Sequence, residues 1–128
     1  MFRVLSDKYY IDSSGNKMPL SKIFSKGVPL IISDVDSTYL KDLGLLGNYI
    51  KNDIFFKDHI SGLEIIENEI YFYVNGYSYQ IKIKDLGEFE TSFMNYKAFF
   101  KSVEKDSVLT QLSSINLNFK NQVIVQKK

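Results

Sequence analysis

Residues 69–84 read Glu-Ile-Tyr-Phe-Tyr-Val-Asn-Gly-Tyr-Ser-Tyr-Gln-Ile-Lys-Ile-Lys, and this stretch decides the class of fold. Apolar residues alternate with other residues on both sides of Asn75-Gly76, which is typical of two half-buried strands. An Asn-Gly pair favours a type I′ turn because both of its residues must adopt positive φ. The stretch therefore predicts an antiparallel hairpin, and Leu63-Glu64-Ile65-Ile66 before it predicts a further strand.

Two apolar stripes with helical spacing flank this segment. The first predicts a helix over residues 36–56, with its stripe at Tyr39, Leu43, Leu46, Ile50 and Ile54. The second predicts a helix over residues 88–105, with its stripe at Phe89, Phe93, Tyr96, Phe100 and Val103. Shorter strands are expected before the first helix and after the second. We therefore expect one α+β domain over residues 1–128, a curved antiparallel sheet with two packed helices.

The bulk composition limits the classes of function. Apolar residues make up 45% of the 128 residues and the net charge is +1, so we expect a soluble domain with no nucleic-acid partner. The absence of cysteine excludes disulfides, thiolate metal sites and thiol catalysis. No run approaches the roughly 18 consecutive apolar residues of a membrane span.

An alternative function is suggested by Ser33-Asp34-Val35-Asp36-Ser37-Thr38, which follows an apolar run. It resembles the Asp-x-Asp-x-Thr motif of haloacid-dehalogenase-type phosphatases, in which the first Asp is nucleophile and magnesium ligand and the second is general acid. No downstream acidic pair completes the magnesium site, so we favour a turn and helix cap made by Asp34 and Asp36. A small magnesium-dependent phosphatase that uses these two residues stays the alternative.

The other reactive or aromatic residues predict no cofactor, metal or catalytic site. His59 is the only histidine, and its position between a helix and a strand favours a solvated loop residue. Four tyrosines crowd the hairpin, and we expect them to form cross-strand pairs or an exposed contact face. These tyrosines are Tyr71, Tyr73, Tyr77 and Tyr79.

The last fourteen residues predict a strand and its return, which has an open edge. Ile115, Leu117 and Phe119 alternate with polar residues, and Gln122-Val123-Ile124-Val125 returns after a bend at Lys120-Asn121. No later strand follows to cover this return. Such an edge is either protected by the terminal lysines or recruits a strand from a partner.

Both ends of the chain resemble the extracytoplasmic β-domain of the FtsQ/DivIB family of bacterial cell-division proteins. The first match is Tyr9-Tyr10-Ile11-Asp12-Ser13-Ser14-Gly15, which is similar to the family's aromatic strand with Ile-Asp-x-x-Gly, followed by a segment containing Pro19. The second is Ile115-Asn116-Leu117-Asn118-Phe119-Lys120-Asn121-Gln122-Val123, which is similar to its closing strand. The resemblance covers nearly the whole chain in order.

The resemblance implies a non-enzymatic scaffold of the divisome, the machinery that forms the septum. Full-length relatives have a cytoplasmic tail, one membrane helix and a POTRA domain before the β-domain. Residues 1–4 would then form the junction with the POTRA domain. The domain would lie on the periplasmic face of the cytoplasmic membrane, held there only by the N-terminal helix of the full-length protein. An interaction module that pairs at its sheet edge, unrelated to division, is a further alternative.

The resemblance also implies the partners and the surface that binds them. FtsB-like and FtsL-like division proteins would bind the C-terminal sheet edge. The residues expected to bind them are Asn118, Phe119, Lys120, Asn121, Gln122, Val123, Ile124 and Val125. Phe119 stands where relatives commonly have Tyr, so a hydrogen bond from that hydroxyl is not expected here.

Overall fold

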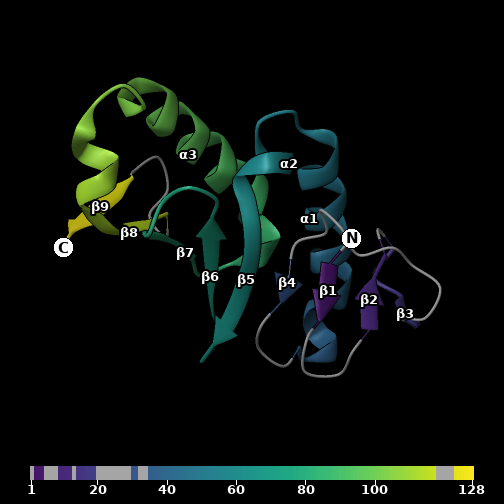
Figure 1. Ribbon diagram of the computed structural model, residues 1–128. Helices are drawn as coiled ribbons and strands as arrows, with labels where there is room; N and C mark the ends of the chain where they lie inside the picture. The colour runs from purple at the N-terminus through teal and green to yellow at the C-terminus, as the bar shows by residue number, and fades with distance from the viewer. Residues whose placement is uncertain (1, 5–8, 13, 20–29, 32–34, 118–122) are drawn as a thin grey trace.

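The computed structural model describes residues 2–4, 9–12, 14–19, 30–31, 35–117 and 123–128. Its strands form one open sheet in the order β3-β2-β1-β4-β5-β6-β7-β8-β9 (Figure 1). The strands are β1 (Phe2–Val4), β2 (Tyr9–Ile11), β3 (Lys17–Pro19), β4 (Leu30–Ile31), β5 (Ile60–Ile66), β6 (Glu69–Val74), β7 (Gln80–Ile83), β8 (Leu112–Asn116) and β9 (Ile124–Lys127). With two long helices, this architecture confirms the α+β class.

The sheet is mixed, which corrects the expectation of a wholly antiparallel sheet. The pairs β1–β4, β4–β5 and β7–β8 are parallel, whereas the other pairs are antiparallel. Both predicted helices lie within crossover connections, one between β4 and β5 and the other between β7 and β8. A crossover that returns the chain to the same end of the sheet makes the strands on either side of it parallel.

The central strands have the alternation that the sequence predicts, but the tight turn lies elsewhere. Glu67 (φ 51°) and Asn68 (φ 67°) join the paired residues Ile66 and Glu69, and two successive positive φ angles define a type I′ turn. At the predicted site the strands instead stop at Val74 and resume at Gln80. The side-chain amide of Asn75 donates a hydrogen bond to the Asp58 carbonyl at 2.8 Å, which holds this longer loop against α2, the short helix (Phe56–His59) before β5.

The first predicted helix is divided in two by its own capping residues. The 3₁₀ turn η2 (Ser37–Tyr39) begins where Asp36 Oδ1 accepts a hydrogen bond from Thr38 N at 3.0 Å, and α1 (Leu40–Asn52) continues from it. Asp53 Oδ1 then accepts from the amides of Phe55 and Phe56 and starts α2 (Phe56–His59). Because α1 has ended, Ile54 is 92% exposed, which corrects its predicted place on the buried stripe.

The second predicted helix is confirmed as α3 (Phe89–Val103), preceded by η3 (Leu86–Glu88) and followed by η4 (Ser107–Gln111). Its buried residues are Phe89, Phe93, Tyr96 and Phe100. The Phe93 ring lies 5.1 Å from Phe72 of β6 and 6.1 Å from Tyr49 of α1. Both helices therefore pack on the same face of the central strands, and aromatic contacts fill the space between them.

One glycine is required where the short strand β4 joins the sheet. A Cβ atom on Gly62 would lie 2.5 Å from the carbonyl oxygen of Leu30, its partner in the ladder. Any side chain at this position would push β4 away from β5. Gly62 thus keeps the N-terminal strands attached to the central ones.

Candidate functional site

The C-terminal strand β9 forms one edge of the sheet. Among the described strands it pairs only with β8, with Val125 opposite Ile115 and Ile124 opposite Asn116. Figure 1 shows β9 and β3 at opposite ends of the molecule. Within the described ranges, no strand lies on the outer side of β9, so this edge offers main-chain groups to another chain.

Two hydrogen bonds establish which main-chain groups of β9 face outward. The amide of Lys128 donates to the Gln111 carbonyl at 2.9 Å, and the Ser113 hydroxyl donates to the Gln126 carbonyl at 3.1 Å. Successive residues of a strand direct their main-chain groups to opposite sides. The N–H and C=O groups of Val125 and Lys127 therefore point away from β8, toward the open side.

The side chains of this edge are partly apolar. Val125 is 38% exposed and Ile124 is 44% exposed, while Val123 packs against the hydrophobic core. Because directly opposed residues share a face, Val125 lies on the same side of the sheet as the buried Ile115. A further strand beside β9 would cover apolar surface as well as pair its main chain.

The opposite edge is less suited to pairing. β3 has three residues and ends on Pro19, which has no N–H to donate. Short edges that contain proline are a common protection against added strands. The two edges therefore differ, because β9 is the longer of the two and contains no proline.

The predicted binding residues lie only in part within the described residues. Ile124 and Val125 lie in the edge strand β9 and Val123 immediately precedes it, whereas residues 118–122 lie outside the described residues. The predicted binding residues stop at Val125, whereas β9 runs to Lys127 and its ladder extends to Lys128. The periodicity of apolar residues could not find Gln126 and Lys127, because an exposed edge strand needs no apolar residue there.

Of the two residues of the alternative phosphatase interpretation, Asp34 and Asp36, the structure describes only Asp36. Asp36 is the cap of η2, as the cap interpretation predicts, and Asp34 lies outside the described residues. Among the residues that the structure describes, no three His, Cys, Asp or Glu side chains gather in a way that could hold a metal ion. The carboxylate of Asp36 therefore has a structural role at the start of the helix.

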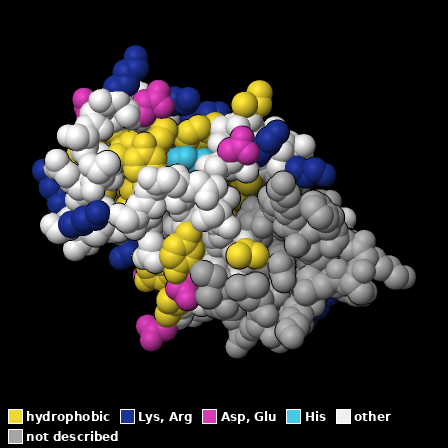
Figure 2. Space-filling model, viewed as in Figure 1, with side chains coloured by type: hydrophobic (Ala, Val, Ile, Leu, Met, Phe, Trp, Pro, Cys, Tyr) yellow, Lys and Arg dark blue, Asp and Glu magenta, His cyan; other side chains and the backbone are white. Residues whose placement is uncertain are grey.

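His59 is buried, which corrects its prediction as a solvated loop residue. It is 8% exposed, its ring stacks on Phe55 with centroids 4.5 Å apart, and its Nε2 hydrogen-bonds the Tyr96 hydroxyl. That hydroxyl also contacts the hydroxyl of Tyr79 at 2.5 Å. In Figure 2 only a small cyan area of this histidine shows among hydrophobic side chains.

The surroundings of His59, Tyr79 and Tyr96 favour the uncharged form of each side chain. Burial, together with the nearby Lys101 ammonium, lowers the pKa of His59 to about 4. Burial also raises the pKa of Tyr79 to about 12 and raises the pKa of Tyr96 strongly. Three neutral groups joined by hydrogen bonds stabilise the contact between α2, α3 and the loop before β7.

The tyrosines of the hairpin divide between two environments. Tyr71 donates to Glu69 at 2.7 Å and Tyr73 donates across the strands to Glu64 at 3.0 Å, on the outer face of the sheet. Tyr77 and Tyr79 precede β7 and contact each other at 5.5 Å between ring centroids. Because Tyr79 is also buried, the four tyrosines do not form one exposed contact face.

Comparison with known proteins identifies one family. A family model described as FtsQ/DivIB, C-terminal related, matches residues 1–126. No curated protein matches the chain. Within the described part of the chain, every helix is too short or too polar to cross a membrane.

Proposed function

Because the chain belongs to the FtsQ/DivIB C-terminal-related family, we propose that it is a non-catalytic scaffold domain that binds partner division proteins through the outer side of β9. The family acts in bacterial cell division as a scaffold without catalytic activity. The partners that fit this role are the FtsB-like and FtsL-like proteins of the same divisome. We also place the domain outside the cytoplasm, anchored by a membrane helix in the full-length protein, as in its family.

The observation that carries this proposal is the open main chain of β9. The outward groups of Val125 and Lys127 can form the ladder that an added partner strand requires. In this mode, main-chain hydrogen bonds supply affinity and side-chain contacts supply specificity. The exposed surface of Ile124 and Val125 adds apolar area that the partner would remove from water.

Amide hydrogen exchange of the protein, with and without a partner segment, tests the proposal. The segments are the extracytoplasmic parts of the FtsB-like and FtsL-like proteins from the same organism. Binding at the edge should slow exchange at Val125 and Lys127, whereas Gln126, which already faces β8, should change less. Slower exchange confined to another surface, such as the Tyr71 face of the sheet, would contradict the proposal.

A further inference from the structure

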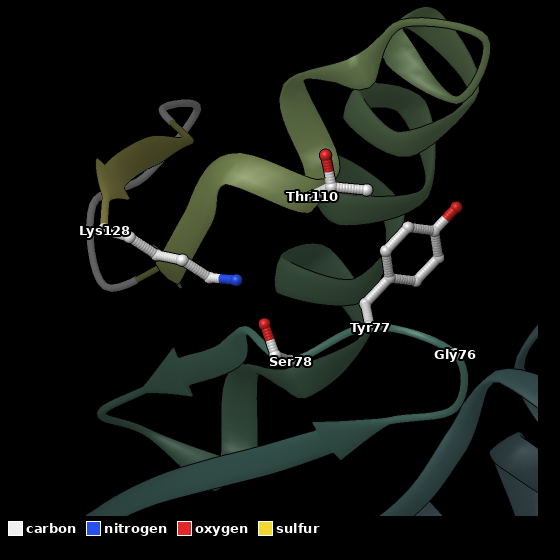
Figure 3. A pocket seen from close by; sticks show the side chains of 5 residues that line it. All are labelled: Gly76, Tyr77, Ser78, Thr110 and Lys128. Carbon is white, nitrogen blue, oxygen red and sulfur yellow. The ribbon is translucent and has the colours of Figure 1, made fainter.

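The open edge at β9 carries little of the charge that usually protects an edge strand. Charged side chains, above all lysine, commonly guard such edges against added strands. β9 contains one charged residue, Lys127, beside the exposed apolar side chains of Ile124 and Val125. Lys128 follows the strand, but Figure 3 shows its side chain directed toward Ser78, into the open pocket of about 410 Å³ that both residues line. The outer side of β9 is therefore weakly protected.

We propose that a second copy of this chain pairs with β9 when no partner segment is bound, so that each copy covers the edge of the other. The inference rests on the function proposed above and specifies how that edge is regulated, because self-pairing and partner binding exclude each other. Two identical edges can meet across a twofold axis, since such an interface uses the same surface on both copies. The two strands then run antiparallel, and the sheet continues from one copy into the other.

The main chain of β9 selects one register for this pairing. Residues that direct their N–H and C=O groups outward must face each other, because such pairs exchange both hydrogen bonds. Within β9 these residues are Val125 and Lys127. A twofold axis at Gln126 places Val125 of each copy opposite Lys127 of the other, and every outward main-chain group of β9 then has a partner. An axis at Val125 would instead leave Lys127 opposite Val123, which lies outside β9.

The side chains favour the same register. An axis at Lys127 would place the two lysines directly opposite each other, and opposed like charges destabilise a sheet. An axis at Gln126 lays the aliphatic stem of each Lys127 along the exposed Val125 of the other copy, which removes apolar surface from water. The two lysines are then diagonal neighbours, about 7–8 Å apart along the sheet. Their weak repulsion should make self-pairing stronger as salt is added.

The contact is small, which suits a reversible cover for the edge. It uses the four residues of β9 in each copy, far fewer than the roughly 20–30 residues a side of a stable complex. Self-pairing should therefore be weak in solution and yield to a partner segment that makes further contacts. Anchoring in a membrane, as proposed above, would raise the effective concentration of one copy beside another. The edge would then stay covered until a partner segment displaces the second copy.

The absence of cysteine from the sequence allows a direct test of the register. With a twofold axis at Gln126, the two copies of this residue have Cα atoms about 4.5 Å apart, a distance that a disulfide spans. Gln126→Cys should therefore form disulfide-linked dimers under mild oxidation. Ile124→Cys is the matched control, because it is exposed on the same face of β9 but lies about 13 Å along the strand from its equivalent. Gln126→Cys should cross-link at least about tenfold faster than this control.

Two further measurements follow self-pairing and its effect on the partner. In sedimentation equilibrium, the apparent mass of the unaltered protein should rise with protein concentration and with salt, whereas Val125→Pro should stay monomeric. The linked Gln126→Cys dimer should bind the extracytoplasmic segment of the FtsB-like protein at least about tenfold more weakly than its reduced form, because both edges are occupied. Reduction should restore the affinity. A linked dimer that binds the segment as tightly as the reduced form would contradict the exclusion of the partner.

Failure of self-pairing and failure of the proposed function give different results. If the unaltered protein binds the segment but Gln126→Cys cross-links no faster than Ile124→Cys, self-pairing is wrong while the proposed function stands. If Gln126→Cys cross-links as expected but its reduced form and the unaltered protein bind neither the FtsB-like nor the FtsL-like segment, self-pairing stands and the proposed function fails.

Discussion

The amide of Lys128 donates a hydrogen bond to the carbonyl of Gln111 at 2.9 Å, and this bond sets the orientation of every main-chain group in β9. Because the orientation alternates along a strand, Gln126 faces β8 while Val125 and Lys127 face outward. Proline substitutions can therefore remove an inner or an outer N–H at neighbouring positions. A proline at Gln126, where the N–H faces β8, is therefore the control for a proline at Val125, where the N–H faces outward.

Replacing Phe93 with Ala should destabilise the protein by about 3–5 kcal/mol, because its ring is fully buried between α1, α3 and β6. Urea denaturation followed by circular dichroism measures the change. Met94→Ala, on the exposed face of the same helix, should change the free energy of unfolding by no more than about 0.5 kcal/mol. Equal effects of the two substitutions would show that the helix does not pack as described.

Replacing Asp36 with Ala should cost about 1 kcal/mol of stability, since the carboxylate caps η2 through the Thr38 amide. Asp36→Asn keeps an acceptor oxygen and should cost less. Chemical denaturation of the two variants compares the losses. The structural role would be contradicted by magnesium-dependent phosphatase activity that disappears in Asp36→Asn.

The stability of the protein should fall as the pH is lowered from about 6.5 toward 5. The pKa of His59 is about 4 in the folded protein and near 6.5 when unfolded, so the unfolded chain binds the extra proton in this window. The slope should approach about 1.4 kcal/mol per pH unit at its steepest. Urea denaturation across this range measures it.

The slope near pH 6 is assigned to His59 because it is the only histidine and the carboxyl groups titrate mainly below pH 5. His59→Gln should unfold at lower denaturant than the unaltered protein at pH 7, because it loses the ring contact with Phe55, and its stability should vary less between pH 6.5 and 5. A flat profile in the unaltered protein would show that the imidazole is exposed to solvent.

The sequence predicts those helices and strands whose apolar residues recur with the spacing of a single helix or strand. The stripe of α3 is buried at Phe93 and Tyr96, as its spacing requires. Local signals were less reliable wherever a tertiary contact competed with them. Asn75-Gly76 has the composition of a tight turn, but Asn75 instead hydrogen-bonds α2 through Asp58 and His59, and the type I′ turn forms at Glu67-Asn68.

The wrong predictions for Ile54 and His59 also arise from contacts that the local sequence pattern does not contain. Ile54 fits the stripe of the first helix, but the Asp53 carboxylate begins a new helix and leaves Ile54 in solvent. His59 has polar neighbours in sequence, yet the hydroxyl of Tyr96, 37 residues later, is its partner in the core. For the candidate site, the terminal strand at Ile124 and Val125 could be predicted from β-propensity, whereas the orientation of its main-chain groups is seen only from the contact between Lys128 and Gln111.

The affinity of Val125→Pro for the extracytoplasmic segment of the FtsB-like protein tests the central claim most directly. This change removes an N–H that faces outward, so the protein should stay folded and bind the segment about tenfold more weakly or worse. The control Gln126→Pro removes an N–H that faces β8 and should lower the melting temperature. A folded Val125→Pro variant that binds the segment as tightly as the unaltered protein would contradict the claim that β9 is the binding edge.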